Sequence, residues 1–145
     1  MEIYTIGFTQ TTARGFFTRL ADARIEHVLD IRLNNSSQLA GFAKASDLPY
    51  FLEELIGARY EHEPLLAPTK ELLDQARGRG ADWPRFAERF LALLRERRVE
   101  ELLSPSDFER RTALLCSEAA ADRCHRRLVG EHLGASWPDV TVIDL

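Results

Sequence analysis

Short apolar stretches alternate along this chain with segments in which apolar residues recur every three or four positions. A short continuous apolar run predicts a strand that is buried on both faces, as in a parallel sheet. Such runs fall at residues 2–7, 27–32, 112–116 and 141–145, with a weaker candidate at 58–62. We expect a strand at each of these places.

The segments between the strands have the periodicity of amphipathic helices. Predicted helices run from a Thr11 or Thr12 cap to about Ala23, from a Ser46 cap to about Ile56, from Pro68-Thr69 to about Arg77 before the Gly-Arg-Gly stretch at 78–80, from an Asp82 cap onward, and finally to about Leu133, with Gly134 as the stop. Strands that alternate with helices predict βαβ units. We expect an α/β fold, a single three-layer α/β/α domain over residues 1–145 with a mostly parallel sheet.

The composition, 45% hydrophobic and 29% charged residues over a length of 145, is that of a globular domain. No apolar run approaches the roughly 20 residues of a membrane span, and the N-terminal MEIYTIGF lacks the basic start of a signal peptide. We expect a cytoplasmic protein with two free thiols and no membrane partner. The net charge of −4 disfavours nucleic acid as a partner without excluding it, and the oligomeric state is left open.

The densest chemistry lies in residues 113–128, ALLCSEAAADRCHRRL. A thiol, a carboxylate, an imidazole and guanidinium groups gather where a strand is expected to give way to a helix, the junction at which α/β proteins bind ligands. The catalytic candidates are Cys124, as a nucleophile or redox thiol, and Glu118, as an acid–base group. The candidate ligand-binding residues of this segment are Cys116, His125 and Arg126.

Two interpretations of Cys124 stay open. If Asp122 caps the last helix, Cys124 and His125 lie in its first turn, where free N–H groups lower the pKa of a thiol. If Ser117 is the cap instead, Cys124 lies further into the helix and most of that effect is lost. Helical spacing also sets Cys124 at the edge of the apolar face, so the second interpretation is that Cys124 is a small packing residue and His125 a hydrogen-bonded core histidine.

A metal site is the next possibility for this segment. Cys116, Glu118, Cys124 and His125 have side chains that zinc accepts, but their spacing matches none of the usual zinc motifs. Adjacent residues on a helix also point about 100° apart, which makes joint coordination by the cysteine and histidine awkward. A phosphatase-like or rhodanese-like anion loop would need a glycine and a nearer arginine than SEAAADR provides. The sequence therefore predicts no metal and no cofactor.

Polar residues follow the first two predicted strands, and the carboxyl ends of parallel strands meet at one edge of a sheet. The candidate ligand-binding residues there are Thr9, Arg32, Asn34, Asn35, Ser37 and Gln38. Asp30 lies within the second strand, where an unpaired carboxylate is costly, so we expect it to pair with Arg32; it is also an acid–base candidate. Thr69 and Lys70 either help to hold a phosphate or are a capping threonine and a solvated lysine.

Four motifs in this order, TIGFT, LDIR, CSE and CHR, resemble the pattern of the bacterial and archaeal family called domain of unknown function 488. The stretches NNSSQLAGF, YEHEPLLAPTKELLD and DLPYFL are similar to one branch of that family, so the resemblance spans nearly the whole chain. The family commonly has histidine and serine after TIG, where this chain has Phe8 and Thr9. The resemblance implies that Asp30, Arg32 and the residues of CSE and CHR are characteristic positions, and it implies no particular activity.

Two functions compete at this point. The first is a small cytoplasmic enzyme or ligand-binding domain for a polar, phosphate-bearing or nucleotide-like compound, with Arg32 and Arg126 holding an anion. The second is a noncatalytic module that binds nucleic acid or protein through one basic face. That face would contain Arg95, Arg97, Arg98, Arg110, Arg111, Arg123 and Arg127. A closed pocket favours the first function, and a broad positive face without a pocket favours the second.

Overall fold

Five parallel strands form one sheet among the residues that the computed structural model describes, which are 1–36, 40–77, 80–118, 121 and 123–145. The strands are β1 (Glu2–Gly7), β2 (His27–Asp30), β3 (Arg59–His62), β4 (Thr112–Cys116) and β5 (Thr141–Asp144). Their order in the sheet is β3-β2-β4-β1-β5, and every neighbouring pair is parallel. Each expected strand is present.

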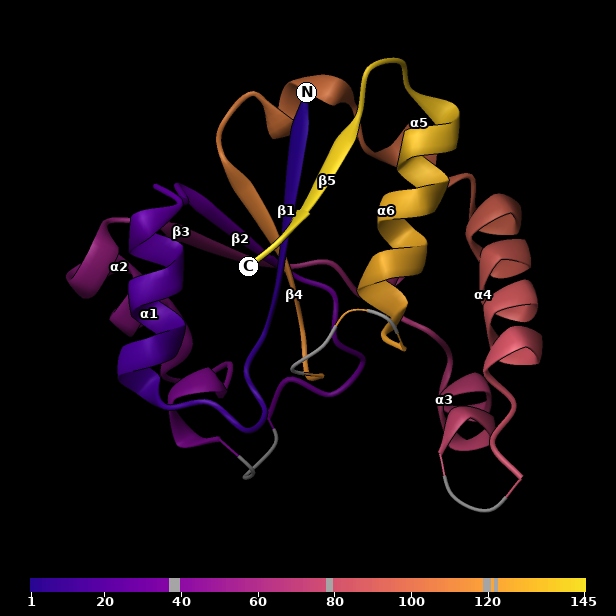
Figure 1. Cartoon of the computed structure of the whole chain (residues 1–145), viewed down its shortest axis with the longest axis horizontal. Coiled ribbons are helices and arrows are strands. Elements are labelled where there is room, and N and C mark those ends of the chain that lie inside the picture. The colour runs from indigo at the N-terminus through magenta and orange to yellow at the C-terminus, as the bar shows by residue number, and fades with distance from the viewer. Residues whose placement is uncertain (37–39, 78–79, 119–120, 122) are drawn as a thin grey trace.

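Helices cover both faces of this sheet, which confirms the three-layer α/β/α architecture (Figure 1). On one face lie α1 (Ala13–Asp22) and α2 (Leu48–Ile56), and on the other lie α3 (Lys70–Ala76), α4 (Trp83–Arg97), α5 (Val99–Leu102) and α6 (His125–Ser136). Short 3-10 turns occupy Gly41–Ala43, Pro64–Leu66 and Pro105–Phe108. Crossing a bilayer would need a longer and more apolar helix than any in the described part of the chain.

The strands supply apolar side chains to a core on each face of the sheet. Ile3 and Leu114 pack in the core under α4 and α6, whereas Ile6 and Leu115 pack in the core under α1 and α2. Alternate residues of one strand point to opposite faces. A strand that is buried on both faces therefore reads as a continuous apolar run, which is why the sequence revealed these strands.

Three helix starts follow the capping rule. The side chains of Thr12, Thr69 and Asp82 each accept a hydrogen bond from a backbone N–H in the first turn of α1, α3 and α4. The expected Ser46 cap of α2 is wrong, because the N-cap residue is Asp47 and it makes no side-chain capping bond.

The last helix differs most from its prediction. α6 begins at His125, with Cys124 at the N-cap position and no side-chain capping bond. Ser117 is therefore not the cap, and the alternative cap, Asp122, lies outside the described residues. The backbone of Cys124 is extended, with φ −126° and ψ 141°, so this residue precedes the helix. Gly134 does not end α6, which continues to Ser136.

The strand order decides where a ligand site can form. β4 lies between β1 and β2. The connections that leave β1 and β2 carry α1 and α2 over one face, whereas the connection that leaves β4 carries α6 over the other (Figure 1). A place where the connections from neighbouring strands leave toward opposite faces is a topological switch point. The loops diverge there and leave a crevice beyond the carboxyl ends of the strands.

Candidate functional site

A cavity of about 470 Å³ opens at this switch point. It lies beyond the ends of β1, β2 and β4, and the start of α6 and the α3–α4 region complete its walls. Its lining residues are Phe8, Thr9, Arg32, Leu33, Asn34, Pro68, Leu73, Ala76, Arg77, Ala81, Trp83, Phe86, Cys116, Ser117, Glu118, Arg123, Cys124 and His125. The polar loops that the sequence placed at one edge of the sheet thus meet there.

Only some of the predicted site residues line the cavity. The candidates on its surface are Thr9, Arg32, Asn34, Cys116, Glu118, Cys124 and His125. The candidates that do not line it are Asp30, Asn35, Thr69, Lys70 and Arg126. Ser37 and Gln38 lie outside the described residues.

Gly7 lets two of these loops cross closely. The sheet register sets Gly7 beside Cys116, and the N–H groups of Phe8 and Thr9 donate to the Ser117 carbonyl at 3.2 and 3.0 Å. A Cβ on Gly7 would overlap the backbone carbonyl of Glu118. The glycine of TIG is therefore a packing requirement of the loop that carries Cys116.

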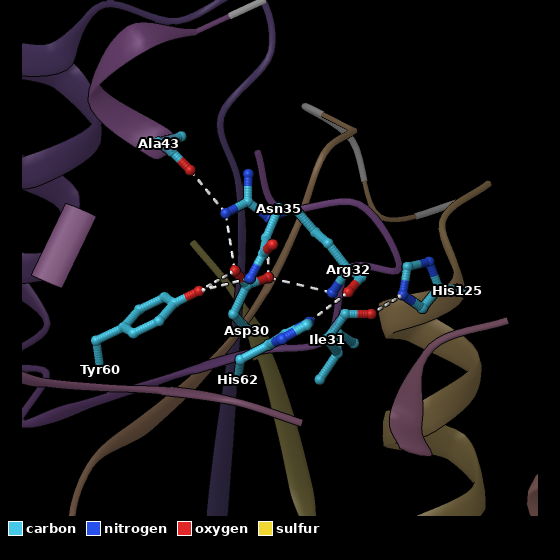
Figure 2. Close-up of polar contacts among 8 residues, drawn as sticks. All are labelled: Asp30, Ile31, Arg32, Asn35, Ala43, Tyr60, His62 and His125. Atoms are coloured by element: carbon cyan, nitrogen blue, oxygen red, sulfur yellow. Dashed lines mark hydrogen bonds and ion pairs between the residues drawn. The ribbon is translucent and has the colours of Figure 1, made fainter. Parts of the chain in front are cut away.

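Asp30 and Arg32 form the buried pair that the sequence predicted, and Figure 2 shows their contacts. Nε and Nη2 of the guanidinium donate to the two carboxylate oxygens at 2.8 Å each, and Nη2 also donates to the Ala43 carbonyl at 2.7 Å. The side chain of Asp30 is 0% exposed and that of Arg32 is 3% exposed. The centre of the Phe8 ring lies 5.0 Å from the guanidinium carbon of Arg32.

The remaining contacts of Asp30 define its role. Its carboxylate also accepts from the Arg32 backbone N–H at 3.1 Å and from the Tyr60 hydroxyl at 2.6 Å, and Asn35 donates to that hydroxyl at 3.2 Å (Figure 2). Four donors occupy the lone-pair directions of this carboxylate. Since Asp30 is also away from the cavity, the geometry makes it the residue that orients Arg32 rather than a proton carrier at the cleft. Burial, and next to it the hydrogen bond that the Tyr60 hydroxyl donates to Asp30, raise the pKa of Tyr60 to about 12.

Cys116, Cys124 and His125 meet at the base of the cavity and are all buried. Nε2 of His125 lies 2.7 Å from the Ile31 carbonyl (Figure 2), and a ring nitrogen in that position donates. In the neutral ring Nδ1 is then the acceptor, and it faces the Cys116 sulfur at 3.2 Å. The edge of the ring packs against Phe90, with centroids 5.6 Å apart, which fixes its orientation.

The two thiols have opposite electrostatic surroundings. Burial, the largest influence, raises the pKa of Cys116, but the Cys124 thiol, the backbone N–H groups of Ser117 and Glu118, and the charge of Arg126 together lower that pKa below its ordinary value. The pKa of Cys124 is raised, because its thiol hydrogen-bonds to Cys116 and because it is buried. The expectation that the helix start lowers the pKa of Cys124 is wrong, and Cys116 is the thiol whose pKa lies below its ordinary value.

Arg126 lies behind the site. Its Nη1 donates to the Glu118 carbonyl, its Nε donates to the Thr5 hydroxyl at 3.3 Å, and the residue is 1% exposed. It therefore holds the loop after β4 in place, beneath the surface on which a ligand could lie. Thr69 caps α3, as the second of the two interpretations of Thr69 and Lys70 held, and Lys70 does not line the cavity.

The α3–α4 region supplies a wall that the sequence did not predict. Trp83 and Phe86 form an aromatic surface continuous with Phe90, with centroid separations of 5.4 and 5.8 Å along the row. Arg77 and Arg123 add two exposed guanidinium side chains to the lining. The one available signal was a tryptophan directly after the Asp82 cap, as the first residue of the helix.

The fold and the cavity define a small parallel α/β protein with a ligand-type cleft at its topological switch point. The family described as domain of unknown function DUF488 matches residues 12–133, and the chain belongs to it. No curated protein and no solved structure matches the chain. The family assignment confirms the resemblance and carries no activity with it.

Proposed function

We propose that the cleft binds a polar, phosphate-bearing or nucleotide-like small molecule and acts on it. The observation that carries this proposal is one cavity with guanidinium groups, an aromatic wall and a thiol–imidazole cluster on its surface. Its volume, about 470 Å³, falls within the range of about 300–1,000 Å³ that small-molecule sites occupy.

Different residues of the cavity lining suit the phosphate and the ring of such a ligand. Arg77 and Arg123 offer donors to a phosphate, whereas Arg32 is already neutralised by its bidentate carboxylate partner. Trp83 offers a flat surface on which a base or another ring can stack. Glu118, exposed at the cleft, is the acid–base candidate, and the cluster around Cys116 forms the reactive floor.

The rival function, a basic face for nucleic acid or protein, has weaker support. Arg95, Arg97 and Arg98 lie at the end of α4 opposite Trp83, and Arg110 and Arg111 precede β4, whereas Arg123 and Arg127 follow it. Arg97 donates to the carbonyls of Leu65 and Ala67, and Arg98 and Arg127 pair with Glu101 and Glu131. These arginines are divided between two ends of the sheet, which favours the cleft.

We also place the protein in the cytoplasm. Cys116 and Cys124 are both unbridged and buried. Free thiols of this kind persist in a reducing compartment.

Intrinsic fluorescence tests the proposed ligand class. Trp83 lines the cleft, whereas Trp137 packs against Phe108 in the core, so the two tryptophans report on different places. We expect saturable quenching by AMP, weaker quenching by ribose 5-phosphate or adenosine alone, and no quenching in the Trp83→Phe variant.

Arginine variants locate the phosphate. Arg123→Ala should raise the Kd for AMP about tenfold, because one charge-assisted contact is lost. Arg127→Ala is the matched control, since this exposed arginine pairs with Glu131 outside the cleft, and it should leave the Kd unchanged. Absence of saturable quenching by any phosphate probe, or equal weakening by both variants, would count against the cleft. Binding to RNA that weakens as the salt concentration rises would favour the basic face instead.

A further inference from the structure

The floor of the cleft brings three metal-ligating side chains to one point. Single ligand atoms of Cys116, Cys124 and His125 all lie within 4.8 Å of one another. The first residue ends β4, and the other two lie at the start of α6. Because Cys124 is extended and precedes the helix, the 100° separation expected of neighbouring helical residues does not keep its sulfur away from His125.

The imidazole is oriented as a metal ligand. Its Nε2 donates to the Ile31 carbonyl at 2.7 Å, and Phe90 packs against the ring. A histidine that binds a metal through one nitrogen commonly donates its other N–H to a carbonyl or carboxylate, which fixes the tautomer. Here that arrangement presents Nδ1 to the Cys116 sulfur at 3.2 Å.

The separations fit a tetrahedral zinc ion. Zn–S bonds of about 2.3 Å and Zn–N bonds of about 2.0–2.1 Å place ligand atoms about 3.8 Å apart for two sulfurs and about 3.6 Å apart for sulfur and nitrogen. The Cys116–His125 distance of 3.2 Å and the 4.8 Å limit on all three separations bracket these values. The Cys116–His125 separation would have to widen by about 0.4 Å, and Cys124 would have to move by at most about 1 Å, to admit the ion.

We propose that Cys116, Cys124 and His125 bind one zinc ion at the floor of the cleft. Two thiolates and an imidazole are a soft ligand set that zinc favours, and both thiol protons pass to solvent when the ion binds. All three residues line the cavity, so the fourth coordination position faces the cleft. Three protein ligands with one open position are the pattern of a catalytic zinc site, in which water or a ligand oxygen fills the fourth place.

Zinc binding is measured in the absence of the small molecule. A negative result for zinc is therefore distinguishable from a negative result for the proposed function. Untagged protein treated with a chelator is titrated with Zn²⁺ against a competing chromophoric chelator, and separately with Co²⁺. We expect one ion per chain and the thiolate-to-cobalt charge-transfer and tetrahedral d–d absorption of a cysteine-bound cobalt ion. Zinc should also protect both cysteines of the native chain from alkylation.

Two substitutions place the ion. Cys124→Ser should weaken zinc binding by at least about a hundredfold, since loss of a supporting contact alone costs about 10–100-fold. His27→Gln is the control, because this histidine pairs with Glu61 away from the cleft, and it should leave the affinity unchanged. Arg123→Ala should likewise leave zinc binding intact.

Three results would overturn the site: no thiolate charge-transfer band with cobalt, cysteines that alkylate at the same rate with and without zinc, or a folded Cys124→Ser variant that keeps its affinity. The first two use only the native chain, so they decide the question even if the variant fails to fold. AMP binding in the metal-free protein would then still support the cleft.

Discussion

Replacement of Asp30 by alanine removes the anion from a buried ion pair and leaves its cation behind. The guanidinium of Arg32 would stay in an environment where its side chain is 3% exposed, with the Ala43 carbonyl and the Phe8 ring as its neighbours. We expect the free energy of unfolding to fall by about 3–5 kcal/mol.

The contacts of the carboxylate support that magnitude. It accepts four hydrogen bonds, two of them from the charged guanidinium. Each charged bond contributes about 1.5–3 kcal/mol, and each buried donor left without a partner costs about 1–3 kcal/mol, although these values do not add fully. A loss of 3–5 kcal/mol is large against a typical total of about 5–15 kcal/mol.

Equilibrium unfolding in urea, followed by far-ultraviolet circular dichroism and by Trp137 fluorescence, measures the change. Tyr60→Phe, which removes one of the four hydrogen bonds, is the graded control and should cost about 1 kcal/mol. The double variant Asp30→Leu/Arg32→Met removes both charges and should recover much of the loss. A loss below about 1 kcal/mol for Asp30→Ala, or a double variant no more stable than the single one, would refute the reasoning.

Two further predictions concern the same edge of the sheet. Gly7→Ala should lower the free energy of unfolding, measured by chemical denaturation, by about 1–3 kcal/mol or more, because the added Cβ overlaps the Glu118 carbonyl. Gly41→Ala is the control, since its Cβ meets nothing within 4 Å, and it should change that free energy by less than about 0.5 kcal/mol. Equal effects of the two substitutions would contradict the close crossing of the loops at Gly7. The raised pKa of Tyr60, about 12 against an ordinary 10.0, means that its contribution to stability is complete below pH 10 and is lost as the pH rises toward 12. The tyrosinate absorbance of the native chain minus that of Tyr60→Phe checks this, and ionisation at pH 10 would contradict the bond to Asp30.

The strands were predictable because burial on both faces leaves a continuous apolar run in the sequence. Helix starts were predictable where a side chain caps the backbone, as at Thr12, Thr69 and Asp82. The start of α6 left no such signal, since Cys124 occupies its N-cap position without a capping bond. The strand order could not be predicted, because it depends on which helices pack together and not on the local pattern.

The candidate site was predictable where its residues are chemically distinctive, as in the thiols, the imidazole and the Asp30–Arg32 pair. The aromatic wall was missed because Phe86 has the spacing of an ordinary core residue in α4, and because nothing local shows that this helix reaches the cleft. The expected lowering of the pKa of Cys124 was wrong for a related reason. Its environment depends on the neighbouring Cys116 sulfur, which a helical wheel does not contain.

The position of β4 between β1 and β2 also governs when this protein can fold during synthesis. β1 pairs only with β4 and β5 among the described residues, so it has no partner until residues 112–116 have left the ribosome. Before that point the growing chain can form the β2–β3 pair but no continuous sheet. Parallel pairings between distant segments form slowly and leave strand edges open meanwhile. The β2–β3 pair and β1 are therefore joined into one sheet only when the strand that ends in Cys116 pairs with both β1 and β2. The cleft is completed by residues 123–125, which follow that strand, and β5 adds to β1 last.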